Sequence, residues 1–210
     1  MRQSTKVFLQ LLVFGFAIQG HATNTGQDNP QLRVFVMDNA TTSQLLPDAE
    51  RTASRVFRQA GVVVHWVNCS LAPDCPGDIQ TGDLVIRMVP HARSLQSEVF
   101  GVSFLGSGGV GVYADVFLES IQQLRESAND VSASATLGAV IAHELGHLLL
   151  GTNAHSPQGI MQARWQAEQL RNVGQGRMLF TPEQAGRLRN KIVCSNTASE
   201  KVAVVASLKR

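Results

Sequence analysis

The stretch His143-Glu144-Leu145-Gly146-His147-Leu148-Leu149-Leu150-Gly151-Thr152-Asn153-Ala154-His155 decides how this 210-residue chain is interpreted. Residues four apart on a helix lie on one face, so both imidazoles of His143 and His147 can reach one ion at about 2.0–2.1 Å. Glu144 is rotated around the helix, which suits it to contact a water beside the ion. His155 follows the helix-ending Gly151 and is the candidate third ligand.

The residues before this stretch predict a buried helix over 135–150. Apolar side chains recur along it and small residues lie between them, so another element can pack closely. The apolar positions are Leu137, Val140, Ile141, Leu145, Leu148 and Leu149, and the small ones are Ala139, Ala142 and Gly146.

The motif resembles that of the metzincin clan of zinc endopeptidases. The clan has HExxH, a glycine at which the chain turns, a third histidine and a Met-turn below the metal. Here Gly159-Ile160-Met161 is similar to the Met-turn, and His155-Ser156 followed closely by Met161 resembles the matrixin branch.

This resemblance implies a role for each matching residue. His143, His147 and His155 would bind Zn²⁺, and Glu144 would act as the general base on the water that zinc activates. Met161 would form the Met-turn. Trp165 lies outside the motif, and we expect it to pack under this turn.

The spacing departs from the clan pattern at the third ligand. The clan places glycine three residues and the third histidine six residues after the second histidine, where this chain has Leu150 and Asn153. Gly151 and His155 fall one and two residues later. Thermolysin-like enzymes take a Glu from a following helix instead, so Glu168 is the alternative third ligand.

Outward from the motif, alternating and helical periodicities predict the other elements. Their order, together with the resemblance, implies an α+β fold. It would have a twisted mixed β-sheet of about five strands, an active-site helix, a Met-turn and a C-terminal helix. Strands are expected at 31–37, 62–67, 84–89, 98–104 and 110–116, and helices at 46–60, 116–127, 135–150, 162–172 and from Thr181.

The C-terminal helix has a strong start signal. Thr181 is placed as the N-cap, Pro182 occupies the first helical position and Gln184 completes the capping-box spacing. The stretch 202–208, VAVVASL, fits either a strand or a frayed helix end.

The N-terminus has the pattern of an export signal. Arg2 and Lys6 precede the apolar run 7–18, and Gly20 and Ala22 supply the small residues that a signal peptidase reads. We therefore expect a signal peptide at 1–22, a metallopeptidase domain at 23–195 and a C-terminal tail at 196–210. The mature protein would be secreted, extracellular or periplasmic, with no membrane segment after cleavage.

Export also bears on the three cysteines, because an oxidising compartment favours disulfides. Cys69 and Cys75 flank a short Pro-containing loop, which makes a local disulfide plausible. Cys194 is then left free or paired elsewhere.

The charge pattern argues against nucleic acid as a partner. The formal net charge is only +2 and there is no basic stripe. The 106–111 stretch matches GxGxxG, but a β-rich run follows it rather than a helix, so it predicts a turn between strands.

These observations predict a secreted zinc endopeptidase that hydrolyses a peptide or protein substrate. The 98–116 region is the candidate edge strand for holding an extended peptide. Two alternatives remain: a non-catalytic, zinc-stabilised binding module, and a zinc amidase that acts on cell-wall peptides.

Overall fold

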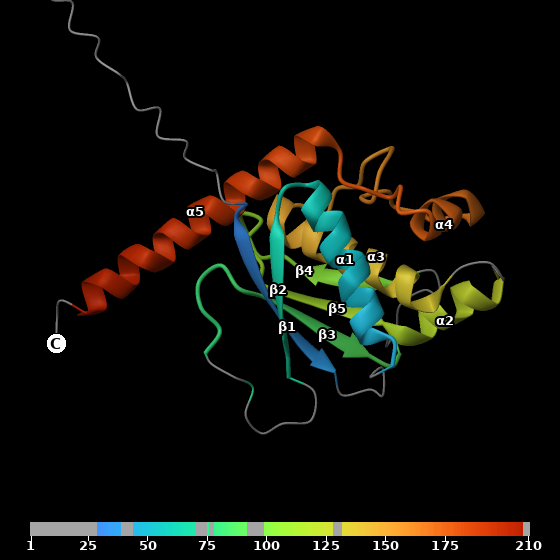
Figure 1. Ribbon diagram of the computed structural model, residues 1–210, viewed down its shortest axis with the longest axis horizontal. Helices are drawn as coiled ribbons and strands as arrows, with labels where there is room; N and C mark the ends of the chain where they lie inside the picture. Colours follow the sequence, from blue (N-terminus) through green and yellow to red (C-terminus); the bar gives the residue numbers. More distant parts are fainter. Residues whose placement is uncertain are drawn as a thin grey trace, which may run out of the picture.

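A five-stranded β-sheet with helices packed against it forms the framework of the chain (Figure 1). The computed structural model describes residues 29–38, 44–69, 75, 78–91, 99–127 and 132–207, so the expected signal peptide at 1–22 lies outside the described residues. The elements are β1 (Gln31–Asp38), α1 (Leu46–Gln59), β2 (Val63–Asn68), β3 (Leu84–Val89), β4 (Gly101–Phe104), β5 (Tyr113–Phe117), α2 (Leu118–Ser127), α3 (Ala133–Leu150), α4 (Ala167–Gly174) and α5 (Pro182–Ser207).

The sheet is mixed, with strand order β2-β1-β3-β5-β4. β1 pairs in parallel with β2 and with β3, and β3 pairs in parallel with β5. β4 alone runs antiparallel to its neighbour, β5, and it forms one edge of the sheet. This arrangement confirms the predicted α+β fold with a five-stranded mixed sheet.

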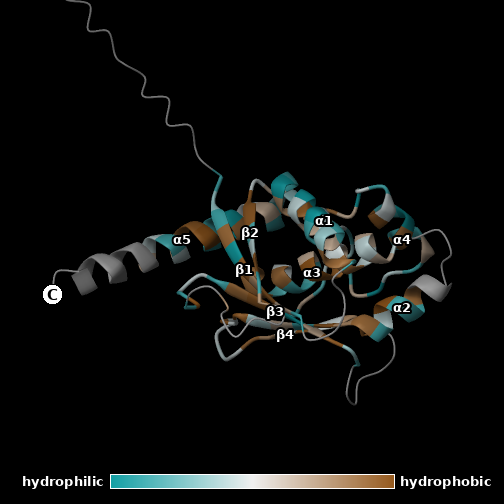
Figure 2. Cartoon of the chain, turned by 60° about the horizontal axis from the view of Figure 1, so that its bottom comes forward, coloured by the Kyte–Doolittle hydropathy of each residue, from teal (hydrophilic) through white to brown (hydrophobic). Residues whose placement is uncertain are grey.

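Helix α3 is the central element of the core. Residues Thr136 to Leu149 are all buried, because its apolar side chains meet the sheet on one side and α1 and α5 on the others. Figure 2 shows hydrophobic residues gathered along α3 and the neighbouring strands, whereas the outer surface of α1 is hydrophilic. α3 is long and apolar enough to cross a membrane, but most of it is buried inside the fold, as for a core helix of a globular domain.

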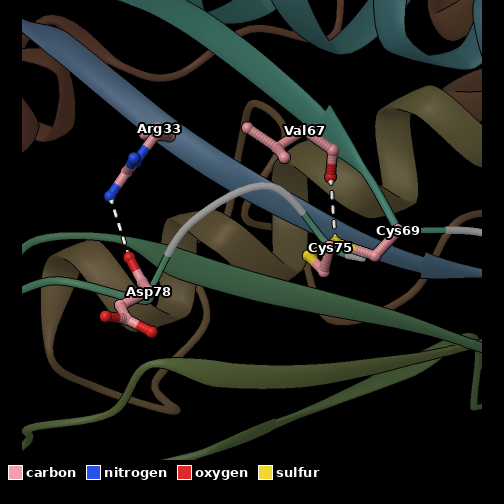
Figure 3. Close-up of a disulfide and its surroundings, with 5 residues drawn as sticks. All are labelled: Arg33, Val67, Cys69, Cys75 and Asp78. Carbon is pink, nitrogen blue, oxygen red and sulfur yellow. Dashed lines mark hydrogen bonds between the residues drawn. A yellow bond between two sulfur atoms is a disulfide. The ribbon is translucent and has the colours of Figure 1, made fainter. Parts of the chain in front are cut away.

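The opposite face of the sheet carries a smaller apolar cluster. It contains Phe35, Val85 and Cys69, and the disulfide between Cys69 and Cys75 lies beside it (Figure 3). The expected local disulfide is therefore present, and Cys194 is free and exposed on α5. The Arg33 guanidinium donates to the Asp83 carboxylate at 2.9 Å and to the Asp78 carbonyl at 3.4 Å, which ties β1 to the chain that follows this disulfide.

Several predicted boundaries differ from the structure; the strands expected at 98–104 and 110–116, for example, begin only at Gly101 and Tyr113. The helix expected at 162–172 begins only at Ala167, where Gln166 is the N-cap and forms a capping box with Gln169. α5 continues to Ser207, so residues 202–207 are helical rather than extended. The far end of α5 projects beyond the sheet (Figure 1).

Candidate metal centre and active site

The candidate metal centre begins on the last two turns of α3. His143 and His147 are one turn apart, and both are buried. The helix then ends at Gly151, whose φ of 66° is the left-handed conformation that glycine adopts at low cost. Gly151 N–H donates to the His147 carbonyl oxygen, and from there the chain reverses towards His155.

Main-chain carbonyl groups fix the orientation of both rings. His143 Nδ1 is 2.7 Å from the Ile160 carbonyl oxygen, and His147 Nδ1 is 2.8 Å from the Thr152 carbonyl oxygen. A carbonyl oxygen can only accept, so each Nδ1 must carry the hydrogen. In the neutral rings, each Nε2 therefore presents a lone pair.

These two lone pairs face each other. His143 Nε2 and His147 Nε2 are 3.0 Å apart, and neither can donate to the other when both rings are neutral. Two nitrogens that bind one zinc ion at about 2.0–2.1 Å in tetrahedral geometry are separated by about 3.3 Å. The pair therefore has the separation and the chemistry of two ligands to one ion.

His155 completes the cluster in spite of its unusual spacing. Its ring centroid lies 5.4 Å from that of His143 and 4.9 Å from that of His147. One ligand atom from each of the three histidines falls within 4.8 Å of the others. The loop before His155 is shaped by Thr152, whose Oγ1 accepts from Ala154 N–H at 3.1 Å.

Glu168, the alternative third ligand, lies elsewhere. It is an exposed residue in the first turn of α4 and takes no part in the three-histidine group. Three neutral imidazoles form a donor set that suits zinc and leaves a coordination position for another ligand.

Burial favours the neutral form of these imidazoles. It lowers the pKa of His143 from 6.5 to about 4, and the neighbouring His147 and His155 lower it further, against the opposing effect of the Ile160 carbonyl. The pKa values of His147 and His155 are lowered too, mainly by burial. Because a metal competes with protons for the same nitrogens, lowered pKa values favour metal binding near neutral pH.

Glu144 lies against the edge strand. It is 4% exposed, and burial raises the pKa of its carboxyl group from 4.5 to about 7, against a hydrogen bond from Ser103 that lowers it. Ser103 Oγ is 2.7 Å from Glu144 Oε2 and 2.8 Å from the Glu144 carbonyl oxygen. A carboxyl group with a pKa near 7 is suited to accept and return a proton at neutral pH.

Met161 packs beneath the metal-binding helix. It is fully buried, and a Cβ added to Gly146 would lie 2.6 Å from Met161 Sδ and 2.8 Å from Phe180 Cε1. The absence of a side chain at residue 146 therefore lets the turn approach α3 closely. Ser156 N–H donates to the Met161 carbonyl oxygen, and Ile160 N–H donates to the Leu179 carbonyl oxygen, so both ends of the turn are held.

The histidines and Glu144 line one cavity of about 280 Å³. The chain at 99–103, at the edge of the sheet, forms one side, and α3 and the turn after Met161 form the other. Trp165 was expected to pack under the Met-turn, but it forms part of the cavity wall, with its ring 5.7 Å from that of His143. Phe100 lies next to it, with ring centroids 6.4 Å apart.

The structure thus brings together His143, Glu144, His147 and His155, the four predicted residues of the site, around one cavity. Sequence reasoning missed Ser103 and Gly101, which contact Glu144 from β4. It also missed the carbonyl groups of Ile160 and Thr152 that orient the imidazoles. No motif marks these positions, because the contacts depend on how distant segments pack.

Comparison of the structure with solved structures finds the same fold in a peptidase. A zinc-dependent peptidase from Methanocorpusculum labreanum aligns with a TM-score of 0.51 and 17% identity, covering 75% of this chain and 99% of that one. Archaemetzincin from Methanopyrus kandleri aligns with a TM-score of 0.47 and 15% identity, covering 81% of this chain and 98% of that one. No protein-family model and no curated protein matches the sequence.

Proposed function

We propose that this chain is a zinc-dependent endopeptidase that is exported from the cell. His143, His147 and His155 bind the zinc ion, and Glu144 is the general base. The observation that carries the proposal is the facing pair of Nε2 lone pairs, with a third imidazole and a buried carboxyl group lining the same cavity. The fold shared with a zinc-dependent peptidase supports it.

The residues of the site divide the chemistry between them. A bound zinc ion supplies Lewis-acid activation of water and of the substrate carbonyl group. Glu144 accepts one proton from the attacking water and delivers it to the nitrogen of the leaving amine, so its carboxylate is regenerated. Burial, which raises the pKa of this carboxyl group, favours its role as a base.

The edge strand gives the substrate a place to bind. β4 is hydrogen-bonded to β5 along one side, and the segment 99–103 borders the cavity. An extended peptide that pairs with this edge would pass its scissile bond across the three histidines. Internal peptide bonds, rather than chain ends, suit a strand that holds the substrate on both sides of the ion.

The decisive experiment measures metal content and peptide hydrolysis together. Wild-type protein should bind one zinc ion per chain and cleave an internally quenched peptide library. Glu144→Gln should keep the zinc ion and lose about 10²- to 10⁴-fold in kcat. Full activity of Glu144→Gln would overturn the assignment of the base, and a wild-type chain that retains no zinc would overturn the whole proposal.

Export is tested separately. The full chain is expressed in a host that secretes, and the N-terminus of the exported product is determined by mass spectrometry. Cleavage after Ala22 is expected. Retention of an intact N-terminus in the cytoplasm would contradict this part of the proposal and leave the chemistry of the site unaffected.

A further inference from the structure

The carboxyl group of Glu144 is flanked by the two residues of β4 that face α3. Ser103 and Gly101 are two apart on the strand, so both point to the same side of the sheet. Ser103 Oγ lies 2.7 Å from Oε2 of the carboxyl group, and a Cβ added to Gly101 would lie 2.6 Å from Oε1. Ser103 therefore holds the carboxyl group by a hydrogen bond, and the absence of a side chain at Gly101 leaves the space that the carboxyl group occupies.

Ser103 also makes a second contact with the same residue. Its hydroxyl oxygen is 2.8 Å from the Glu144 carbonyl oxygen, so the single hydroxyl hydrogen is shared between the main chain and the side chain of Glu144 when the carboxyl group is ionised. Ser103 is 7% exposed, and a hydrogen bond in the protein interior is electrostatically stronger than one in water. The contact spans 41 positions in sequence and links the edge strand directly to the helix that carries the metal ligands.

We propose that Ser103 is a positioning residue, which holds the Glu144 carboxyl group in place for proton transfer and thereby couples the substrate-binding edge strand to the base. This inference rests on the proposed peptidase function. A peptide that pairs with β4 would fix the strand, and the hydrogen bond from Ser103 would pass that constraint to Glu144. A misplacement of about 1 Å at a reacting group lowers rates by about 10²-fold.

The test compares three variants of the full chain. Ser103→Ala removes the hydroxyl group, and Ser103→Cys keeps a side chain of similar shape that forms only weak hydrogen bonds. Ser54→Ala is the matched control, because Ser54 Oγ accepts a 2.8 Å hydrogen bond from Trp66 Nε1 outside the cavity. For each variant we would measure kcat, KM, zinc affinity by chelator competition, thermal midpoint and the pH profile of kcat/KM.

A positioning role predicts a specific pattern. Ser103→Ala and Ser103→Cys both lose about 10- to 100-fold in kcat, with KM within about twofold of wild type and zinc affinity unchanged. Since the lost hydrogen bond stabilises the carboxylate, the acid limb of the pH profile moves to higher pH. Ser54→Ala keeps the wild-type kcat and pH profile even where its thermal midpoint falls.

Other outcomes would overturn the inference. Wild-type kcat in Ser103→Ala, or full recovery of kcat in Ser103→Cys, would mean that the hydroxyl group has no positioning role. A parallel loss of zinc affinity would make Ser103 a residue of the metal centre instead. If Glu144→Gln is inactive while Ser103→Ala is fully active, only the positioning role of Ser103 is rejected. If Glu144→Gln is fully active, the assignment of Glu144 as the general base is rejected.

Discussion

The backbones of Gly109 and Gly151 lie against each other, and a Cβ added to Gly109 would lie 2.2 Å from the Gly151 carbonyl oxygen. Gly109 belongs to the loop between β4 and β5, and Gly151 ends the metal-binding helix. The residue after Gly151, Thr152, supplies the carbonyl group that orients His147. The glycine-rich loop therefore packs on the turn that supports the metal centre.

This contact predicts that Gly109→Ala weakens zinc binding by about 10- to 100-fold, as loss of the groups that orient metal ligands does. The control is Gly108→Ala. Gly108 and Gly109 have φ values of 86° and 72°, so an alanine is strained at both, but a Cβ at Gly108 would meet no atom within 4 Å. Chelator competition should show a loss of zinc affinity in Gly109→Ala but not in Gly108→Ala. Equal zinc affinities in the two variants would disprove the link between the glycine-rich loop and the metal centre.

Zinc binding should stabilise the folded chain. A ligand at 100 times its Kd adds about 2.7 kcal/mol to the free energy of unfolding when it binds only the folded state. We expect this gain in wild type and in Glu144→Gln, and its loss in His155→Ala, which lacks the third imidazole. Urea titrations with and without zinc would measure it, and an undiminished gain in His155→Ala would exclude His155 as a ligand.

Glu144 should make the stability of the metal-free chain depend on pH. Burial raises the pKa of its carboxyl group from 4.5 to about 7, so between these values the folded chain keeps a proton that the unfolded chain releases. The contribution of this group is complete below about pH 4.5 and is lost as the pH rises towards 7.

Glu144→Gln has no proton to lose at this position, so it provides the reference. The free energy of unfolding of wild type minus that of the variant should fall by up to about 3 kcal/mol between pH 4.5 and 7. The histidines make the free energy of unfolding depend on pH in both proteins, so their contribution largely cancels in the difference. The measurement is a series of urea titrations in a chelator, and a difference that stays level or rises with pH would contradict the expectation.

The crossing of α1 and α3 depends on Gly138. A Cβ at this position would lie 2.3 Å from the Ala49 carbonyl oxygen and 2.7 Å from Thr52 Cβ. Gly138→Ala should therefore cost about 2–3 kcal/mol of stability. Gly186→Ala, in α5, meets only Arg189 NH2 at 4.0 Å and should gain up to about 1 kcal/mol, because alanine favours a helix. Equal free energies of unfolding for Gly138→Ala and wild type would argue against the close crossing of α1 and α3.

Local sequence signals were sufficient for part of this structure. Thr181 and Gln184 predicted the start of α5, and both reciprocal hydrogen bonds of the capping box are present. The spacing of His143 and His147 placed two imidazoles on one helical face. These signals work because the residues involved interact within a few positions of one another.

The remaining features depend on contacts between distant segments. Whether His155 would reach the other histidines depended on the loop conformation at Thr152 and on the turn at Gly151, which the number of residues alone does not determine. Ser103 contacts Glu144 across 41 positions, and alternation within a strand does not identify the side chain that it faces. Trp165 lines the cavity from the segment that precedes α4, where its indole N–H donates to the Gln162 carbonyl oxygen.

The carbonyl groups of Ile160 and Thr152 orient the rings of His143 and His147 through contacts with the main chain. Two donors that the main chain already holds lose little orientational freedom on binding an ion, so little of the binding free energy is spent on ordering them.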